Sequence, residues 1–124
     1  ANLRLLHADA FDVLTRWLPA AAVSGVHVYF PDPWPKKRHA KRRLLQPRLY
    51  ALVARVLRPG EPFRIASDVE PYFRSAVREI GETGLFEAVP WPEEAPDRLA
   101  THYALKYARE GRKLQYAKFL RRPD

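Results

Sequence analysis

The chain has 124 residues, no cysteine, 22 Lys and Arg against 14 Asp and Glu, and a formal net charge of +8. This length suits one domain with its own core, and the lack of cysteine excludes disulfides, thiolate metal sites and a cysteine nucleophile. The four histidines are too scattered to predict a metal site, so we expect none. No apolar run approaches the roughly 20 residues that cross a bilayer, and no signal peptide is evident. We therefore expect a cytoplasmic protein that does not bind membranes.

Short apolar runs alternate with amphipathic segments along the chain. The predicted strands cover residues 3–6, 26–30, 62–66, 85–89 and 114–120, and the predicted helices cover 10–18, the segment between Pro47 and Pro59, and 73–80, ending at Gly81. We find no internal repeat and no linker. The alternation predicts a single α/β domain over residues 1–124, with a mostly parallel sheet and helices on its faces.

The most informative stretch is YFPDPWPKKRHAKRR, from Tyr29 to Arg43. Its three prolines predict a stiff, extended loop in which Trp34 is partly exposed. Asp32 lies in the same loop, where it could also simply cap a turn. The six Lys and Arg that follow supply +6 of the net charge of +8. A local basic run beside an aromatic side chain is typical of nucleic-acid binding, although a solvated surface explains such a run about equally well.

Carboxylates follow the first three predicted strands. They are Asp9, Asp32 and Asp68. Ligands of open α/β sheets bind beyond the carboxyl ends of the strands, so we expect the three side chains to converge on one rim beside the basic run. Taken singly, Asp9 and Asp68 are better explained as helix N-caps. The shared rim favours a functional role for both.

These motifs resemble a known family. PDPWPKKRHAKRR, the later LRPG, a strand ending in SD and the T-x-Y block at Thr101 are similar to the bacterial tRNA (guanine-N7-)-methyltransferases over nearly the whole chain. The resemblance implies a Rossmann-like class I fold and methyl transfer from S-adenosylmethionine to N7 of a guanosine in the tRNA variable loop. It implies that Asp32 is catalytic and binds the cofactor together with Asp9, and that Lys36, Asp68 and Thr101 bind the substrate. The RNA-binding segment that it implies comprises Arg38, His39, Lys41, Arg42 and Arg43.

Two features differ from the pattern of that family. Ala104 stands where the motif T-x-[FY]-E has glutamate. The chain also contains no glycine-rich strand-to-helix turn and no second strand with an acidic residue for the cofactor's ribose. We therefore expect the C-terminal part of a methyltransferase domain, with a sheet that lacks its first two strands and leaves the strand at residues 3–6 unpaired from the strand that precedes Asp32. The alternative is a rearranged sheet or one completed by a partner. The chain alone is expected to be inactive.

The residue types suit methylation of guanine N7. This nitrogen has a lone pair at neutral pH, so its attack on a sulfonium methyl group needs positioning and no general base. A carboxylate such as Asp32 could stabilise the cationic product, and Trp34 or Tyr103 could stack on the base. Two other functions stay open. One is a non-catalytic RNA-binding fragment or degenerate paralogue, and the other is methylation of an exocyclic amine, whose usual motif resembles [ND]-P-P-[YFW].

Overall fold

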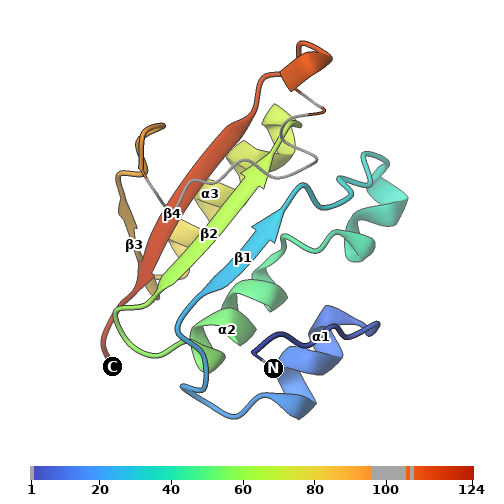
Figure 1. The fold of residues 1–124 in the computed structure, drawn as a ribbon. Helices are drawn as coiled ribbons and strands as arrows, with labels where there is room; N and C mark the ends of the chain where they lie inside the picture. Colours follow the sequence, from blue (N-terminus) through green and yellow to red (C-terminus); the bar gives the residue numbers. More distant parts are fainter. Residues whose placement is uncertain (1, 96–105, 107) are drawn as a thin grey trace.

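The centre of the molecule is a mixed four-stranded sheet (Figure 1). The computed structural model describes residues 2–95, 106 and 108–124. The strands are β1 (Val26–Tyr29), β2 (Pro62–Ser67), β3 (Phe86–Val89) and β4 (Gln115–Arg121), in the order β1-β2-β4-β3. The α/β prediction and all four of these predicted strands are confirmed.

The expectation of a mostly parallel sheet is wrong for these strands. Among the pairs of named strands in the described residues, only β1–β2 is parallel, and one further parallel contact is an isolated bridge between Val23 and Leu57. β4 runs opposite to its neighbours and is inserted between β2 and β3, so both of its pairings are antiparallel. The apolar pattern of a strand does not reveal its direction, because side chains alternate in the same way in both kinds of ladder.

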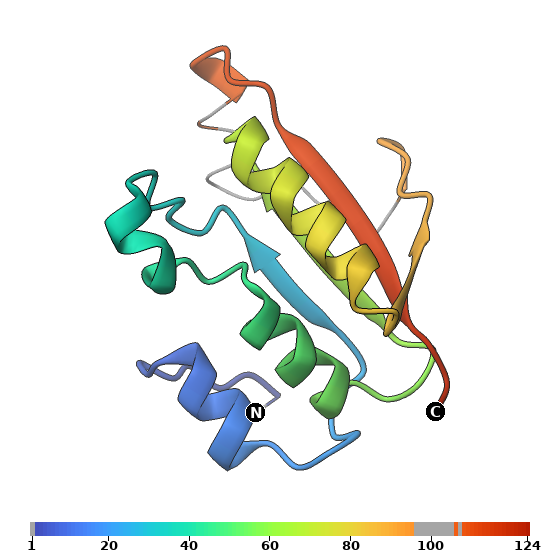
Figure 2. The same ribbon diagram turned by 180° about the vertical axis from the view of Figure 1, so that it is seen from behind.

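Helices α2 (Pro47–Val56) and α3 (Glu70–Glu82) cover one face of the sheet (Figure 2). α2 begins at Pro47 as predicted, since proline suits the first turn of a helix. α3 continues through Gly81, where its end was expected, and is followed by Gly84 in the left-handed conformation with φ of 70°. Helix ends fray, so the last residue of a helix is defined only to within one or two residues. No helix in the described residues is long and apolar enough to cross a membrane.

The N-terminal segment is bound to α2 through an arginine. It forms α1 (Ala10–Asp12) and a π-helical turn, η1 (Val13–Trp17). Arg55 of α2 donates hydrogen bonds to the carbonyl oxygens of Leu14 and Leu18, at 3.0 and 2.9 Å. These bonds satisfy carbonyl groups near the end of the helical segment, which have no partner within it.

The predicted strand at residues 3–6 is wrong. These residues form no strand, and the side chains of Leu3, Leu5 and Leu6 are 74%, 91% and 63% exposed. β1 is at the edge of the described sheet, and residues 3–6 do not pair with it, which confirms the expected lack of pairing. An apolar run becomes a strand only where a neighbouring strand accepts its backbone hydrogen bonds.

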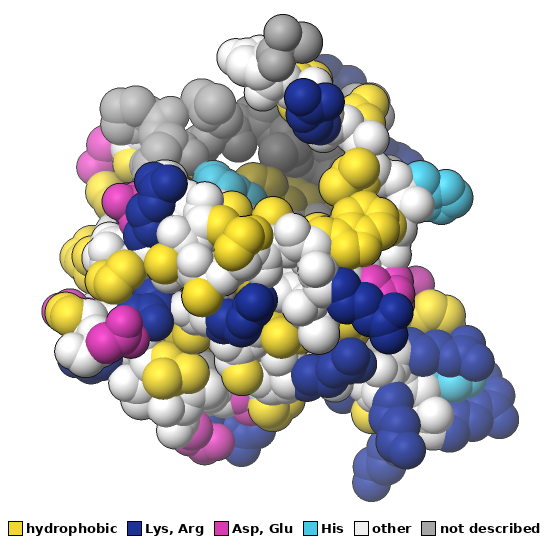
Figure 3. All heavy atoms as spheres, turned by 90° about the horizontal axis from the view of Figure 1, so that it is seen from below, with side chains coloured by type: hydrophobic (Ala, Val, Ile, Leu, Met, Phe, Trp, Pro, Cys, Tyr) yellow, Lys and Arg dark blue, Asp and Glu magenta, His cyan; other side chains and the backbone are white. Residues whose placement is uncertain are grey.

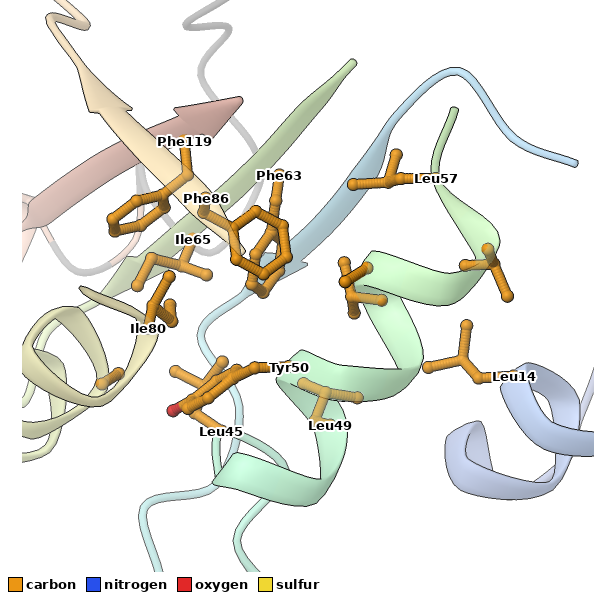
Figure 4. Close-up of a cluster of buried hydrophobic side chains, with 14 of the residues drawn as sticks. Leu14, Leu45, Leu49, Tyr50, Leu57, Phe63, Ile65, Ile80, Phe86 and Phe119 are labelled. Atoms are coloured by element: carbon orange, nitrogen blue, oxygen red, sulfur yellow. The ribbon is translucent and has the colours of Figure 1, made fainter. Parts of the chain in front are cut away.

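The core lies between the sheet and the two helices (Figure 4). The ring of Phe63 lies 5.6 Å from that of Phe86 and 6.3 Å from that of Phe119, measured between centroids. Burying such a side chain contributes about 1.5–3 kcal/mol. Tyr50 of α2 is also fully buried, and its hydroxyl has no hydrogen-bond partner among the described residues. The core fixes the directions in which the loops after β1 and β2 leave the sheet.

Candidate functional site

The loop that follows β1 holds Asp32 in a strained backbone. The Asp32 Oδ1 atom accepts a hydrogen bond from the Trp34 backbone N–H at 3.1 Å, and the carboxylate is exposed. Phe30 and Trp34 have φ values of 53° and 42°. The expected extended conformation is therefore wrong at Trp34. Pro35 alone would favour an extended Trp34, but the Trp34 N–H binds Asp32 and its carbonyl binds Arg43 in the left-handed conformation. Such conformations cost about 1–3 kcal/mol each and persist where the surroundings hold them.

Asp32 and Asp68 line one open hollow beyond the carboxyl ends of β1 and β2. Its volume is about 460 Å³. The parallel register, which pairs Tyr29 with Ala66, makes both strands end at the same side of the sheet (Figure 1). The predicted convergence is thus found for these two carboxylates. The other lining residues are Phe30, Pro31, Pro33, Val69 and Arg112.

Asp68 does not cap the helix that follows it. The N-cap position of α3 is Val69, and the Val69 N–H donates to the Ser67 hydroxyl at 3.1 Å. Asp68 instead forms an ion pair with Arg112, whose Nη1 lies 2.7 Å from Asp68 Oδ2. The alternative of an N-cap is therefore wrong for Asp68, and its carboxylate faces the hollow.

Arg112 is a residue of this hollow that the sequence did not reveal. Besides Asp68, it pairs with Glu110, with 3.0 Å between Nε and Oε2. Only 14% of the Asp68 side chain is exposed, so this carboxylate is mostly shielded from water. Ser67 pairs with Gln115 in the β2–β4 ladder, which brings the residues before β4 beside those after β2. Knowledge of this antiparallel pairing would have placed Arg112 near Asp68.

Asp9 has a structural role in its helix. Its Oδ1 atom accepts a hydrogen bond from the Phe11 N–H at 2.7 Å, so the N-cap alternative is confirmed. Asp9 does not line the hollow of Asp32 and Asp68, so the expected convergence of all three carboxylates is wrong. Its neighbours belong to a second, mostly apolar hollow of about 440 Å³ beside β1. The residues that line the second hollow include Ala8, Ala10, Val28, Tyr29 and Pro31.

The basic run directly follows the Asp32 loop. Its central part is a 3-10 helix, η2 (Lys37–Arg42). Figure 3 shows Lys and Arg side chains gathered with a histidine at one corner of the molecule, a composition that matches this run. Five of its cationic residues are exposed to solvent, and the sixth, Arg43, is half-buried. The exposed ones are Lys36, Lys37, Arg38, Lys41 and Arg42.

Three residues of the run, His39, Arg42 and Arg43, contact Trp34. The Arg42 guanidinium lies 5.0 Å from the centroid of the Trp34 ring, and the His39 ring lies edge-on at 5.4 Å. Arg43 Nε donates to the Trp34 carbonyl oxygen at 3.1 Å. Trp34 is half-buried, which confirms the predicted partial exposure. These protein contacts limit its availability as a stacking surface for a base.

The remaining predicted residues lie outside the described part of the chain. They are Thr101, Tyr103 and Ala104. Within the described residues, no group of three or more His, Asp or Glu side chains gathers as a metal site would require.

Comparison with known proteins assigns the chain to a family. A family model described as "Putative methyltransferase" (Methyltransf_4) matches residues 1–119. The chain belongs to this family. The matched residues include Asp32, Asp68 and Arg112, so the whole hollow lies within the shared region.

Curated relatives of this family member are named tRNA (guanine-N(7)-)-methyltransferase. One from Nitrobacter hamburgensis is 41% identical, with 99% of this chain matching 50% of the relative. Another from Mesorhizobium japonicum is 40% identical over 98% of this chain and 54% of its own length. One from Nitrosococcus oceani is 35% identical over 99% of this chain and 52% of its own length. The chain spans about half the length of the curated relatives it matches.

Solved structures support the fold. A protein from Thermus thermophilus named "Putative DNA Modification Methylase" has a TM-score of 0.56 at 18% identity, covering 94% of this chain and 52% of that one. The structure of its complex with S-adenosyl-L-methionine has a TM-score of 0.51 at 17% identity and covers 94% of this chain and 54% of that one. At these identities the likeness shows the fold alone, which is the Rossmann-like α/β fold of class I methyltransferases.

Proposed function

We propose that this chain is part of a tRNA (guanine-N7-)-methyltransferase and holds the target guanosine. The observation that carries the proposal is the hollow in which Asp32 and Asp68 meet, followed directly in the chain by exposed cations. A pocket with carboxylates binds the donor groups of a base, and adjacent cations bind its phosphates. The names of relatives at 35–41% identity support this assignment. A tRNA substrate would place the reaction in the cytoplasm.

The residues present fit one side of S-adenosylmethionine, the proposed methyl donor. Asp32, and Asp9 from beside the second hollow, would offer carboxylate oxygens to its amino groups. The chain has five glycines, and none forms a glycine-rich turn between a strand and a helix, so the described residues provide no cradle for the carboxylate and ribose of the cofactor. When bound, the cofactor supplies an electrophilic methyl group.

Asp32 has the properties of a group that stabilises the product. Methylation at N7 places a positive charge on the purine, and the exposed Asp32 carboxylate is already oriented by the Trp34 N–H. A preorganised charge needs no rearrangement when the opposite charge develops, and losing one such group typically costs about 100- to 1000-fold in kcat. Asp32 therefore orients the base and stabilises the cation, while guanine N7 itself is the nucleophile.

We assign substrate binding to three further residues. Asp68 would accept hydrogen bonds from the guanine or its sugar, Thr101 would accept or donate them, and Lys36 would bind the substrate as a cation. The phosphates of the tRNA would contact the exposed part of the basic run, above all Arg38 and Lys41. Arg42 and His39, which contact Trp34, would bind RNA only with their outer surfaces.

The test uses the intact gene product, labelled S-adenosylmethionine and tRNA transcripts. We expect Asp32→Asn to lower kcat about 100-fold or more while tRNA affinity stays within about twofold. Asp124→Asn is the matched control, because Asp124 is an exposed carboxylate at the C-terminus, at the opposite end of the sheet from the loops after β1 and β2 (Figure 1). Full activity of Asp32→Asn would refute the catalytic assignment.

A second candidate is a protein that binds RNA without catalysis. The observation that favours it is that the five glycines of this chain form no glycine-rich turn between a strand and a helix. It predicts salt-sensitive tRNA binding by the intact gene product with no methyl transfer and no binding of S-adenosylmethionine. Cofactor titration of the intact gene product separates the two candidates.

A further inference from the structure

We propose that Arg43 is a positioning residue for Asp32 and acts through the backbone of Trp34. The inference rests on the proposed function, because that function gives Asp32 its role. It differs from the expectation drawn from sequence, in which Arg43 contacts RNA together with the other cations of the basic run.

Trp34 connects the two side chains. Arg43 Nε donates to the Trp34 carbonyl oxygen at 3.1 Å, and Arg43 Nη2 lies 3.5 Å from the Pro35 carbonyl oxygen. On its other side, the Trp34 N–H donates to Asp32 Oδ1 at 3.1 Å. Arg43 therefore fixes the carbonyl of the same residue whose N–H orients the Asp32 carboxylate.

The backbone of Trp34 needs such an anchor. Its φ of 42° lies in the left-handed region, which a bulky side chain rarely adopts. A residue persists in this region when its surroundings hold it there. Arg43 binds the carbonyl at the strained position directly, so its loss should let the loop relax and carry the Asp32 carboxylate out of place.

Arg43 is itself held in place from its own side of the loop. The backbone N–H of Arg43 donates to the Ala40 carbonyl oxygen at 3.2 Å, and the backbone carbonyl of Arg43 accepts a hydrogen bond from Gln46 Nε2. The side chain lines a groove of about 250 Å³ between the Asp32 loop and α3, together with Glu79. Burial raises the pKa of Glu79, and the positive charges of Arg78 and Arg43 oppose this rise. Arg43 is half-buried here, whereas Arg38 is exposed to solvent.

The guanidinium group is suited to this task. It presents several N–H donors in a rigid fork and can bind two neighbouring carbonyl groups at once, whereas a lysine ammonium is a single flexible point charge. Arg43→Lys should therefore fail to restore the position of the loop although it keeps the charge. A phosphate contact would respond in the opposite way, because Lys substitutes for Arg as a cation.

The kinetic test compares Arg43→Lys and Arg43→Gln with Arg38→Gln in the intact gene product. We expect both Arg43 variants to lower kcat at least tenfold, with the KM for tRNA and the salt dependence of binding unchanged. Arg38→Gln should raise the KM and lower the salt slope by about 0.7 to 0.9. A lowered salt slope for Arg43→Gln, with full kcat for Arg43→Lys, would overturn the proposal.

A second readout does not depend on activity. The intact gene product is labelled with 5-fluorotryptophan, and Trp34→Phe assigns the fluorine resonance of Trp34. We expect Arg43→Lys and Arg43→Gln to shift this resonance and to increase its solvent isotope shift, while Arg38→Gln leaves it in place. If the resonance shifts but the wild type transfers no methyl group, the link between Arg43 and the loop is supported and the proposed function is refuted. An unchanged resonance in both folded Arg43 variants would overturn the link itself.

Discussion

The exposed cations of the basic run should determine how steeply tRNA binding depends on salt. Lys37 and Arg38 are exposed neighbours at the start of η2, and their side chains make none of the hydrogen bonds or ring contacts described for this run. Replacing both by alanine removes two charges and leaves the described contacts within the protein intact. The expected effect is weaker binding to all tRNA sequences and a flatter salt dependence.

The magnitude follows from the number of phosphate contacts. Removing one phosphate contact lowers the slope of log K against log salt by about 0.7 to 0.9, so the double variant should reduce it by about 1.4 to 1.8. Arg42 and Arg43 already bind the ring and the carbonyl of Trp34. A single replacement of Arg42 or of Arg43 should therefore change the slope of log K against log salt by less than about 0.7.

The assay is filter binding of a tRNA transcript to the intact gene product between about 50 and 200 mM salt. The matched control is Arg16→Ala with Arg58→Ala, which removes the same charge from exposed positions. Arg58 precedes β2 and is thus at the end of the sheet opposite to the hollow, where it donates to Ser24. Equal slopes for wild type and the Lys37 and Arg38 variant would show that this run is only a solvated surface.

Three further predictions concern single side chains. Tyr50→Phe should raise the free energy of unfolding by about 1 kcal/mol, because the buried hydroxyl has no hydrogen-bond partner among the described residues. Tyr72→Phe should lower it by about 1 kcal/mol, because the Tyr72 hydroxyl accepts from the Leu45 N–H at 2.9 Å. Urea titration measures both, and a loss of stability in Tyr50→Phe would show that its hydroxyl is bonded. Asp9→Asn keeps the helix cap, so the free energy of unfolding should change by less than about 0.5 kcal/mol. Calorimetry should show weaker binding of S-adenosylmethionine to the intact gene product. Unchanged affinity would show that Asp9 is only a helix cap. Ala104→Glu should improve discrimination of guanosine over inosine by about 1 kcal/mol in kcat/KM, and equal discrimination would assign that contact to another acceptor.

Local sequence signals predicted most elements that position the site. The apolar run before PDPW indicated β1, proline marked the start of α2, and the parallel β1–β2 pair placed Asp32 beside Asp68 as expected for an α/β sheet. These features depend on residues that are close in sequence or on a general rule of sheet topology. They could therefore be predicted without knowledge of the tertiary structure.

Other features depend on contacts between distant residues. The direction of β4 sets the place of Arg112 beside Asp68, and no pattern within residues 110–121 reveals that direction. Residues 3–6 have the composition of a strand and do not pair with β1. Arg43 is chemically identical to the other arginines of the run, and only the fold turns it toward Trp34. Composition identified the basic run, but the division of its cations between solvent and protein required the structure.

The identity of the methylated atom tests the central claim most directly. The intact gene product would be incubated with S-adenosylmethionine and a tRNA transcript, and the RNA digested to nucleosides and analysed by mass spectrometry against standards. Our account predicts 7-methylguanosine from the variable loop, formed by the wild type and lost in Asp32→Asn. A methyl group on an exocyclic amine of adenine or cytosine, or tRNA binding with no methyl transfer at all, would contradict it.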